Sequence, residues 1–204
     1  MIDYAQPPVD LFLAICQGLG LALAIGIGGA LAALFTSVMA SLDAGIDPDG
    51  TDYEFLGAGW LLVTLLALVV LTVYTRGREA ARYPVVALLA AAGAIAFAAS
   101  LAEEAETAWP GLILGAAVAA GAALLSTSIL DGAIARTGSD ASGTSIEGEA
   151  ATLVLTFALA GMAIAALALF VPPTSIVVAI GLVFLAASRR RRAGEKYEGL
   201  RILR

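Results

Sequence analysis

The sequence predicts an all-α integral membrane protein, a bundle of six transmembrane helices. Of its 204 residues, 60% are apolar and only 14% are charged, whereas about 25% are charged in an average soluble domain. The apolar residues form long blocks rather than a helical or strand pattern, and blocks of about 18 or more residues match the thickness of a bilayer. The basic residues fall between alternate blocks, as they do in cytoplasmic loops.

The six spans follow one another in a single transmembrane domain over residues 1–204. They are predicted at residues 11–42, 57–75, 84–101, 109–134, 150–171 and 173–188. At about 1.5 Å per residue, the first is too long for one perpendicular helix. Residues 9–42 therefore form either one tilted helix or two pieces, with residues 9–17 as a separate interfacial segment. Pro84, Pro110 and Pro173 suit helix starts, where a missing N–H costs nothing.

The charged residues predict the orientation. With six spans, all 11 basic residues fall on the side of the two termini, and residues 189–204 form a basic tail. The positive-inside rule then predicts both termini in the cytoplasm and the protein in the cell (inner or plasma) membrane. The two longer loops on the opposite side carry acidic residues and no basic residue: Asp43, Asp47, Asp49, Asp52, Glu54, Glu103, Glu104 and Glu106.

An internal repeat is one interpretation of the pattern. An offset of 91 positions places Leu34–Met39 on Leu125–Leu130 and Gly57 on Gly148. The halves would be residues 11–101 and 109–188. With three spans each they would insert in opposite orientations, and inverted three-plus-three repeats are typical of transporters. The alternative is composition bias, because chains rich in Ala, Leu and Gly match themselves by chance.

The candidate solute-binding residues are hydroxyls and one carboxylate. Thr127 and Asp131 share a helix face, and a carboxylate beside hydroxyls can bind a hard cation or a polar solute. In the alternative, Asp131 reaches the interface and pairs with Arg136, and the hydroxyls bond within their own helix or to a neighbouring one. The full candidate set is Thr36, Ser37, Ser126, Thr127, Ser128 and Asp131.

The glycines at residues 26–29 of the first apolar block also have two interpretations. In the first, they serve tight packing, because small residues let helices approach closely. Alternatively, they break the first span near the middle of the bilayer and expose backbone carbonyls to a solute.

Three segments resemble a known family. They are the Gly/Ala-rich first span, the Ser/Thr/Gly loop at residues 136–149, and the ending at residues 196–204, which reads KYEGLRILR. Together they resemble the uncharacterised bacterial membrane family "domain of unknown function 4126", loosely and over most of the chain. The resemblance implies a multi-pass architecture and supplies no activity or site.

The function predicted from these features is a small membrane transporter or channel for an ion or small polar solute. The chain has no histidine and one cysteine, and it lacks a nucleophile–base pair, so we predict no enzyme, cofactor or metal site. A net charge of −6 predicts no nucleic-acid partner. The alternative function is a non-catalytic structural or accessory subunit of a membrane complex. The predicted partners are the lipid bilayer and either a second copy or another membrane protein.

Overall fold

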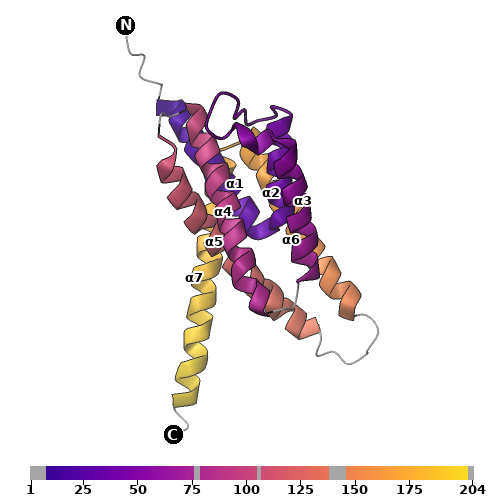
Figure 1. Cartoon of the computed structure of the whole chain (residues 1–204). Coiled ribbons are helices and arrows are strands. Elements are labelled where there is room, and N and C mark those ends of the chain that lie inside the picture. The colour runs from indigo at the N-terminus through magenta and orange to yellow at the C-terminus, as the bar shows by residue number, and fades with distance from the viewer. Residues whose placement is uncertain (1–7, 76–78, 105–106, 138–145, 202–204) are drawn as a thin grey trace.

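The computed structural model describes residues 8–75, 79–104, 107–137 and 146–201 as a bundle of helices (Figure 1). This part of the chain contains no strand, so the predicted all-α fold is confirmed over the described residues. The helices are α1 (Pro8–Gly28), α2 (Ala30–Ser41), the short 3-10 helix η1 (Glu54–Gly57), α3 (Gly59–Tyr74), α4 (Glu79–Glu104), α5 (Trp109–Thr137), α6 (Ile146–Phe170) and α7 (Thr174–Arg201).

The protein is a helical membrane protein by the length and composition of its helices. Four apolar stretches are long enough to cross a bilayer: Val9–Gly28, Ala80–Glu104, Trp109–Ile134 and Ala151–Phe170. Three apolar helices are shorter: Ala30–Ser41, Gly59–Tyr74 and Thr174–Arg189. The prediction of six spans is therefore wrong for the described chain, because its first apolar block forms two helices.

The break in the first block lies at Gly29. This residue has φ 68° and ψ −150°, a backbone conformation open essentially only to glycine. The Gly29 N–H closes the last turn of α1 on the Ile25 carbonyl, and the Gly29 carbonyl accepts the N–H of Ala32 in α2. The chain therefore splits at residue 29, and not after residue 17 as one interpretation of the sequence had it.

The two pieces form a hairpin in which α2 turns back toward the end where α1 begins (Figure 1). The Gln17 side-chain amide donates to the Gly45 carbonyl at 2.6 Å, which ties the middle of α1 to the segment after α2. At about 1.5 Å per residue, α1 covers roughly 30 Å before it turns. The break lies beside the middle of two neighbouring helices, because Gly26 meets Ala119 of α5 and Gly28 meets Gly161 of α6.

Helix α2 is too short to return across the membrane by itself. Its 12 residues cover about 18 Å. The connection at residues 42–58 folds down over the end of α2 and buries Ile46, Pro48 and Leu56. The Ser37 hydroxyl in α2 donates to the Leu56 carbonyl at 2.5 Å. Apolar side chains of the connection therefore occupy space that a longer helix would fill.

Helix α1 is the centre of the bundle and packs against α4, α5, α6 and α7. Small residues make this approach close: a side chain at Gly26 would overlap the Ala119 carbonyl of α5, and one at Gly161 of α6 would overlap the Gly28 backbone. A hydroxyl ties each end of α1 to a neighbour. Ser100 of α4 donates to the Ala14 carbonyl at 3.2 Å, and Ser126 of α5 to the Gly26 carbonyl at 3.1 Å.

Helix α4 begins five residues earlier than the sequence predicted. It starts at Glu79, so Pro84 lies inside the helix and not at its start. Proline has no N–H, so α4 lacks the one backbone hydrogen bond that residue 84 would donate to the Ala80 carbonyl near the beginning of the helix. Because of the earlier start, Arg82, predicted in a loop, lies on the first turns of a membrane helix.

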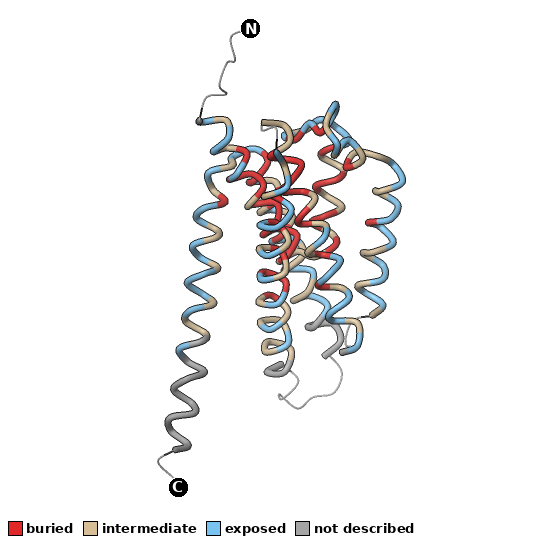
Figure 2. Tube along the Cα trace, turned by 60° about the vertical axis from the view of Figure 1, so that its left-hand side comes forward, coloured by how far each residue is buried: buried red, intermediate tan, exposed pale blue. Residues whose placement is uncertain are grey.

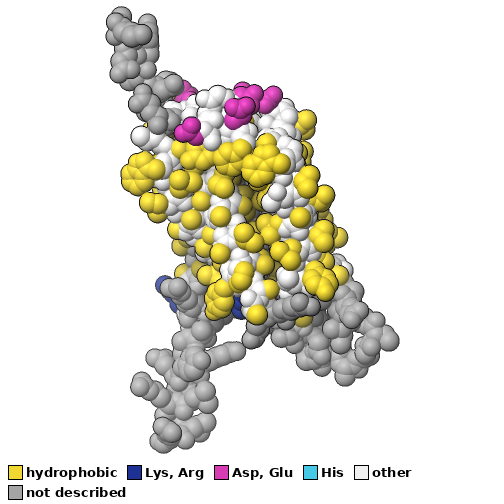
Figure 3. All heavy atoms as spheres, viewed as in Figure 1, with side chains coloured by type: hydrophobic (Ala, Val, Ile, Leu, Met, Phe, Trp, Pro, Cys, Tyr) yellow, Lys and Arg dark blue, Asp and Glu magenta, His cyan; other side chains and the backbone are white. Residues whose placement is uncertain are grey.

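The described charges gather at the two ends of the bundle (Figure 3). We define the acidic end by the connection at residues 42–58 and by Glu103, whose carboxylate accepts the Asp47 N–H. We define the basic end by Arg82 and Arg189. Apolar side chains cover the surface between the two ends in this view. The predicted separation of charge is confirmed for these residues; Arg76, Arg78 and Arg204 lie outside the described residues.

Helix α1 begins at the acidic end, whereas α7 runs away from the bundle at the basic end (Figure 1). The prediction that both termini lie on one side does not agree with this arrangement. The physical reason is the hairpin: the reversal at Gly29 returns the chain to the acidic end before α3 begins (Figure 1).

The packing does not support the inverted repeat. Under the 91-residue offset, α2, α3 and α4 correspond to parts of α5, α6 and α7, and corresponding helices do run in opposite directions (Figure 1). However, α4 packs along α5, while the described residues of their counterparts α7 and α2 make no comparable contact. If a two-fold axis related the two halves, α7 would pack along α2 as α4 packs along α5. Helix α1, the centre of the bundle, would correspond to residues 99–119, which form the end of α4 and the beginning of α5 rather than one helix.

Two helices lie at the periphery, and their surfaces are largely exposed (Figure 2). In α3 only Leu65 is buried, and Trp60 and Tyr74 stand exposed near its ends. Among the side chains of α7 that the structure describes, Ser175 is the buried one and faces Gly20 of α1, whereas Val177 and Phe184 are exposed. These apolar surfaces are available to lipid or to a membrane partner.

The stability of the bundle should depend on the close contact between Gly28 and Gly161. Gly161→Ala should lower the free energy of unfolding by about 1–3 kcal/mol, because the added methyl meets backbone that cannot move aside. Gly121→Ala in α5 is the matched control, since its Cβ would meet nothing within 4 Å and alanine is the better helix former. Unfolding in mixed micelles measures both; equal effects would contradict the packing.

The hairpin predicts which residues share a membrane face. In a Cys16→Ala background, cysteines at Asp10 and Asp49 should react with an impermeant maleimide from one face, and Arg191→Cys should react from the other. Intact proteoliposomes of known protein orientation provide the assay. Labelling of the Asp10 and Arg191 positions from a single face would contradict the reversal at Gly29.

Candidate functional site

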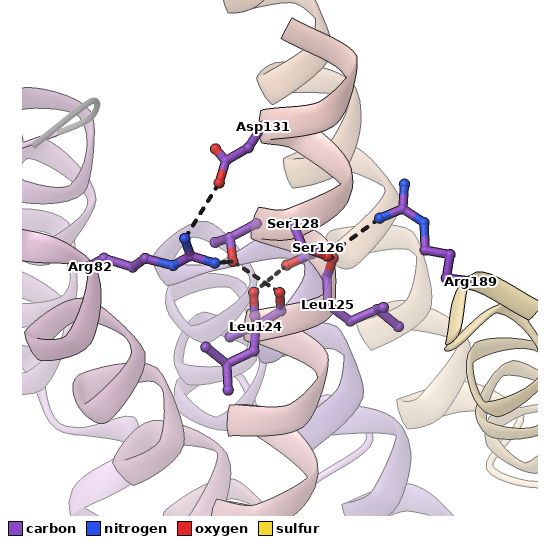
Figure 4. A network of polar contacts seen from close by, with 9 residues as sticks. Arg82, Leu124, Leu125, Ser126, Ser128, Asp131 and Arg189 are labelled. Carbon is purple, nitrogen blue, oxygen red and sulfur yellow. Dashed lines mark hydrogen bonds and ion pairs between the residues drawn. The ribbon is translucent and has the colours of Figure 1, made fainter. Parts of the chain in front are cut away.

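The candidate residues of α5 lie at the basic end, where α5 meets α4 and α7 (Figure 4). Arg82 of α4 contacts two of them: its guanidinium lies 3.6 Å from the Asp131 carboxylate and 3.4 Å from the Thr127 hydroxyl. Thr127 and Asp131 are one helical turn apart, so they share a face as predicted. The described partner of Asp131 is thus Arg82; the side chain of Arg136 lies outside the described residues.

Arg189 of α7 approaches α5 from the other side (Figure 4). Its guanidinium donates to the Ser128 hydroxyl at 3.4 Å, and Ser128 donates to the Leu125 carbonyl of its own helix. Arg189 and Ser188 also line a partly open groove of about 310 Å³, together with Ile129 and Leu185. The groove is therefore apolar along the helices and polar at its basic end.

Ser126 is buried within the bundle and does not join the residues at the basic end. Its hydroxyl lies 3.1 Å from the Gly26 carbonyl of α1 and 3.0 Å from the Ala123 carbonyl of α5. Gly26 lies in the last turn of α1, three residues before the break at Gly29. The structure thus brings one predicted hydroxyl to the glycine-rich stretch that was predicted to expose carbonyls. A hydroxyl has one proton, so it can satisfy only one of the two carbonyls fully at a time.

Thr36 and Ser37 are buried in α2 and do not join the other candidates. The Thr36 hydroxyl donates to the Ala32 carbonyl one turn earlier, and Ser37 holds the Leu56 carbonyl of the connection. These bonds match the structural interpretation of the hydroxyls. The six predicted residues therefore fall into three places: α2, the Gly26 carbonyl, and the basic end.

Sequence reasoning missed the arginines as members of the site. Arg82 and Arg189 were interpreted only as charges that orient the protein, and nothing in their spacing links either of them to α5. A signal did exist: Arg82 precedes Pro84 by two residues and Arg189 ends an apolar helix, so both had to lie at the membrane interface. Which side of α5 each arginine approaches is decided by packing alone.

The described arrangement can bind charged and hydrogen-bonding groups. The two guanidiniums at the basic end suit an anion, and Asp131 offsets the charge of Arg82. The Thr127 and Ser128 hydroxyls donate to the Leu124 and Leu125 carbonyls of their own helix. Carboxylates of Asp43, Asp47 and Asp49 gather within 4.8 Å of one another at the acidic end, where they are exposed.

Comparisons with known protein families, with curated proteins and with solved structures found no match. The resemblance to domain of unknown function 4126 therefore stays a prediction.

The ion pair of Arg82 and Asp131 should contribute little to stability. Their side chains are 41% and 66% exposed, and exposed pairs are typically worth less than about 1 kcal/mol. A double-mutant cycle with Arg82→Gln and Asp131→Asn should show a coupling below that value, reduced further by salt. A coupling above about 2 kcal/mol would show that the pair is shielded from water.

Proposed function

We propose that the protein is a small membrane transporter or channel for an ion or small polar solute. The observation that supports the proposal best is the break between α1 and α2 beside the buried hydroxyl of Ser126. The Gly26 carbonyl and the Ser126 hydroxyl meet there at 3.1 Å.

Broken helices are costly in lipid, which gives the break its weight. Backbone groups within a membrane must be satisfied internally, so irregular backbone is tolerated where protein buries it or where it lines a polar path. In transporters, the carbonyls and helix ends at such breaks contact the solute. In this proposal the Ser126 hydroxyl releases the Gly26 carbonyl in exchange for a solute group that can take its place.

The connection at residues 42–58 is the gate in this proposal. It covers the end of α2, and its polar ties to the rest of the bundle are few. One is the bond between Gln17 and the Gly45 carbonyl, and another is the exposed bond between Glu103 and the Asp47 N–H. If these bonds broke, the connection would be free to move away from the end of α2.

The orientation of the proposal follows from the charges. The positive-inside rule favours the basic end, with Arg82 and Arg189, on the cytoplasmic side. Helix α1 then begins on the opposite side and α7 enters the cytoplasm. In this assignment Arg82 and Arg189 stay on the cytoplasmic side. The start of α1 lies on the opposite side, whereas the sequence predicted the N-terminus in the cytoplasm.

A second candidate is a non-catalytic accessory subunit of a membrane complex. The specific observation that favours it is the exposed apolar surface of α3 and α7 (Figure 2). Within the described residues, α7 packs only against α1 and α6 to any extent. A larger partner could occupy the surface that this leaves open.

Transport should depend on the break and on Ser126. In proteoliposomes assayed with potassium, chloride, inorganic phosphate and glycerol, Ser126→Ala should slow the flux of the transported species about 2- to 10-fold, the effect of one neutral hydrogen bond. Gly29→Ala should slow it as well, because alanine does not tolerate a φ of 68°. Thr156→Ala is the control, since its hydroxyl is exposed and bonds to the Thr152 carbonyl of its own helix.

Two outcomes would count against transport. If none of the four species crosses the membrane faster than through empty liposomes, the proposal fails. If Thr156→Ala slowed the flux as much as Ser126→Ala does, the flux would not depend specifically on the break. A stoichiometric unrelated protein that co-purifies in native detergent, together with an absence of flux, would favour the accessory subunit.

A further inference from the structure

The groove between α5 and α7 combines two kinds of surface. Ile129 of α5 and Leu185 of α7 form its apolar part, and Ser188 and Arg189 form its polar part. The polar part lies at the basic end, where α7 leaves the apolar region of the bundle. Such a groove matches a molecule that has an apolar chain and a polar head, and it is a poor match for a small soluble ion.

The charge of this groove is positive. Arg189 donates to the Ser128 hydroxyl and, within the described residues, lies near no carboxylate. Arg82 differs, because Asp131 lies 3.6 Å away and offsets its charge. The two arginines flank α5 on opposite sides (Figure 4), so Asp131 leaves Arg189 uncompensated. An anionic head is the complement of this site.

The surface next to the groove is continuous with the lipid-facing side of α7. Ile180 and Phe184, toward the acidic end from Leu185, are both exposed. Pockets for whole drug-sized ligands begin at roughly 300 Å³, so a groove of about 310 Å³ holds a head group and the first methylenes of a chain. The remainder of the chain would lie along α7, in the bilayer.

We propose that this groove binds one anionic phospholipid from the leaflet at the basic end. The phosphate diester accepts from the Arg189 guanidinium, and the first acyl methylenes lie against Ile129 and Leu185. The Ser128 and Ser188 hydroxyls border the phosphate but donate their protons to the Leu125 and Leu185 carbonyls. Bound lipid holds α7 beside α5, where the described residues of the two helices have little direct contact. The proposal is independent of transport, because it uses neither the break nor Ser126.

The test is native mass spectrometry of the full chain, titrated in detergent with phosphatidylglycerol and, separately, with phosphatidylcholine. One phosphatidylglycerol should bind more tightly than any phosphatidylcholine. Arg189→Gln should raise its apparent Kd at least tenfold, the effect of one charge-assisted hydrogen bond. Arg82→Gln, which removes the same charge on the other side of α5, should change the Kd less than twofold.

A second pair of variants tests the apolar part without a change of charge. Leu185→Trp should fill the groove and weaken phosphatidylglycerol binding at least fivefold. Phe184→Trp, the neighbouring position, is exposed and does not line the groove, so it should leave binding unchanged. Melting temperatures of all four variants verify that each is folded.

Several results would overturn the proposal. Equal weakening by Arg82→Gln and Arg189→Gln would indicate a diffuse attraction to the basic end. Displacement of the lipid by millimolar inorganic phosphate, with Leu185→Trp silent, would identify a soluble anion as the ligand. A homodimer that forms without lipid and is lost in Leu185→Trp would assign the groove to a second copy.

Discussion

Close approach of small residues around α1 is the interaction on which the rest of the structure depends. Lipid tails are as apolar as leucine, so burial of apolar surface does not drive helices together in a bilayer, and tight packing has to do so. Gly28 meets Gly161 backbone to backbone, and Gly26 meets the Ala119 carbonyl. Each contact lets a neighbouring helix lie near the α1 backbone, where hydroxyls of those helices reach its carbonyls.

The reversal at Gly29 follows from the same stretch of chain. Gly29, with φ 68°, ends α1 beside the middle of α5 and α6, and α2 turns back toward the acidic end. This one reversal places the start of α1 at the acidic end (Figure 1). It also leaves α2 short, so the connection at residues 42–58 has to complete the bundle with buried Ile46 and Leu56.

The polar side chains divide between two tasks. Ser100 and Ser126 fasten α1 to its neighbours within the bundle, and the Ser126 bond is the one on which the transport proposal rests. Arg82 and Arg189 lie at the basic end; Arg82 pairs with the Asp131 carboxylate, and Arg189 lies near no carboxylate of the described residues. The transport proposal rests on Ser126 and the lipid proposal on Arg189, so the two can be tested with different residues.

The sequence by itself determined the class of protein and the segregation of its charges. Long apolar blocks and arginines placed between alternate blocks require a membrane and an orientation, because both are properties of composition along the chain. The pairing of Thr127 with Asp131 on one face was also available, since helical periodicity dictates it.

Only the tertiary structure decided where α1 ends and what the hydroxyls meet. Gly26, Gly28 and Gly29 are alike in sequence, and the position of the break depends on which of them lies against Ala119 or Gly161. Ser126 reaches Gly26 across 100 positions of the chain, and Arg82 reaches Thr127 across 45. Contacts of this kind arise from packing between distant segments, which local propensity and hydropathy do not encode.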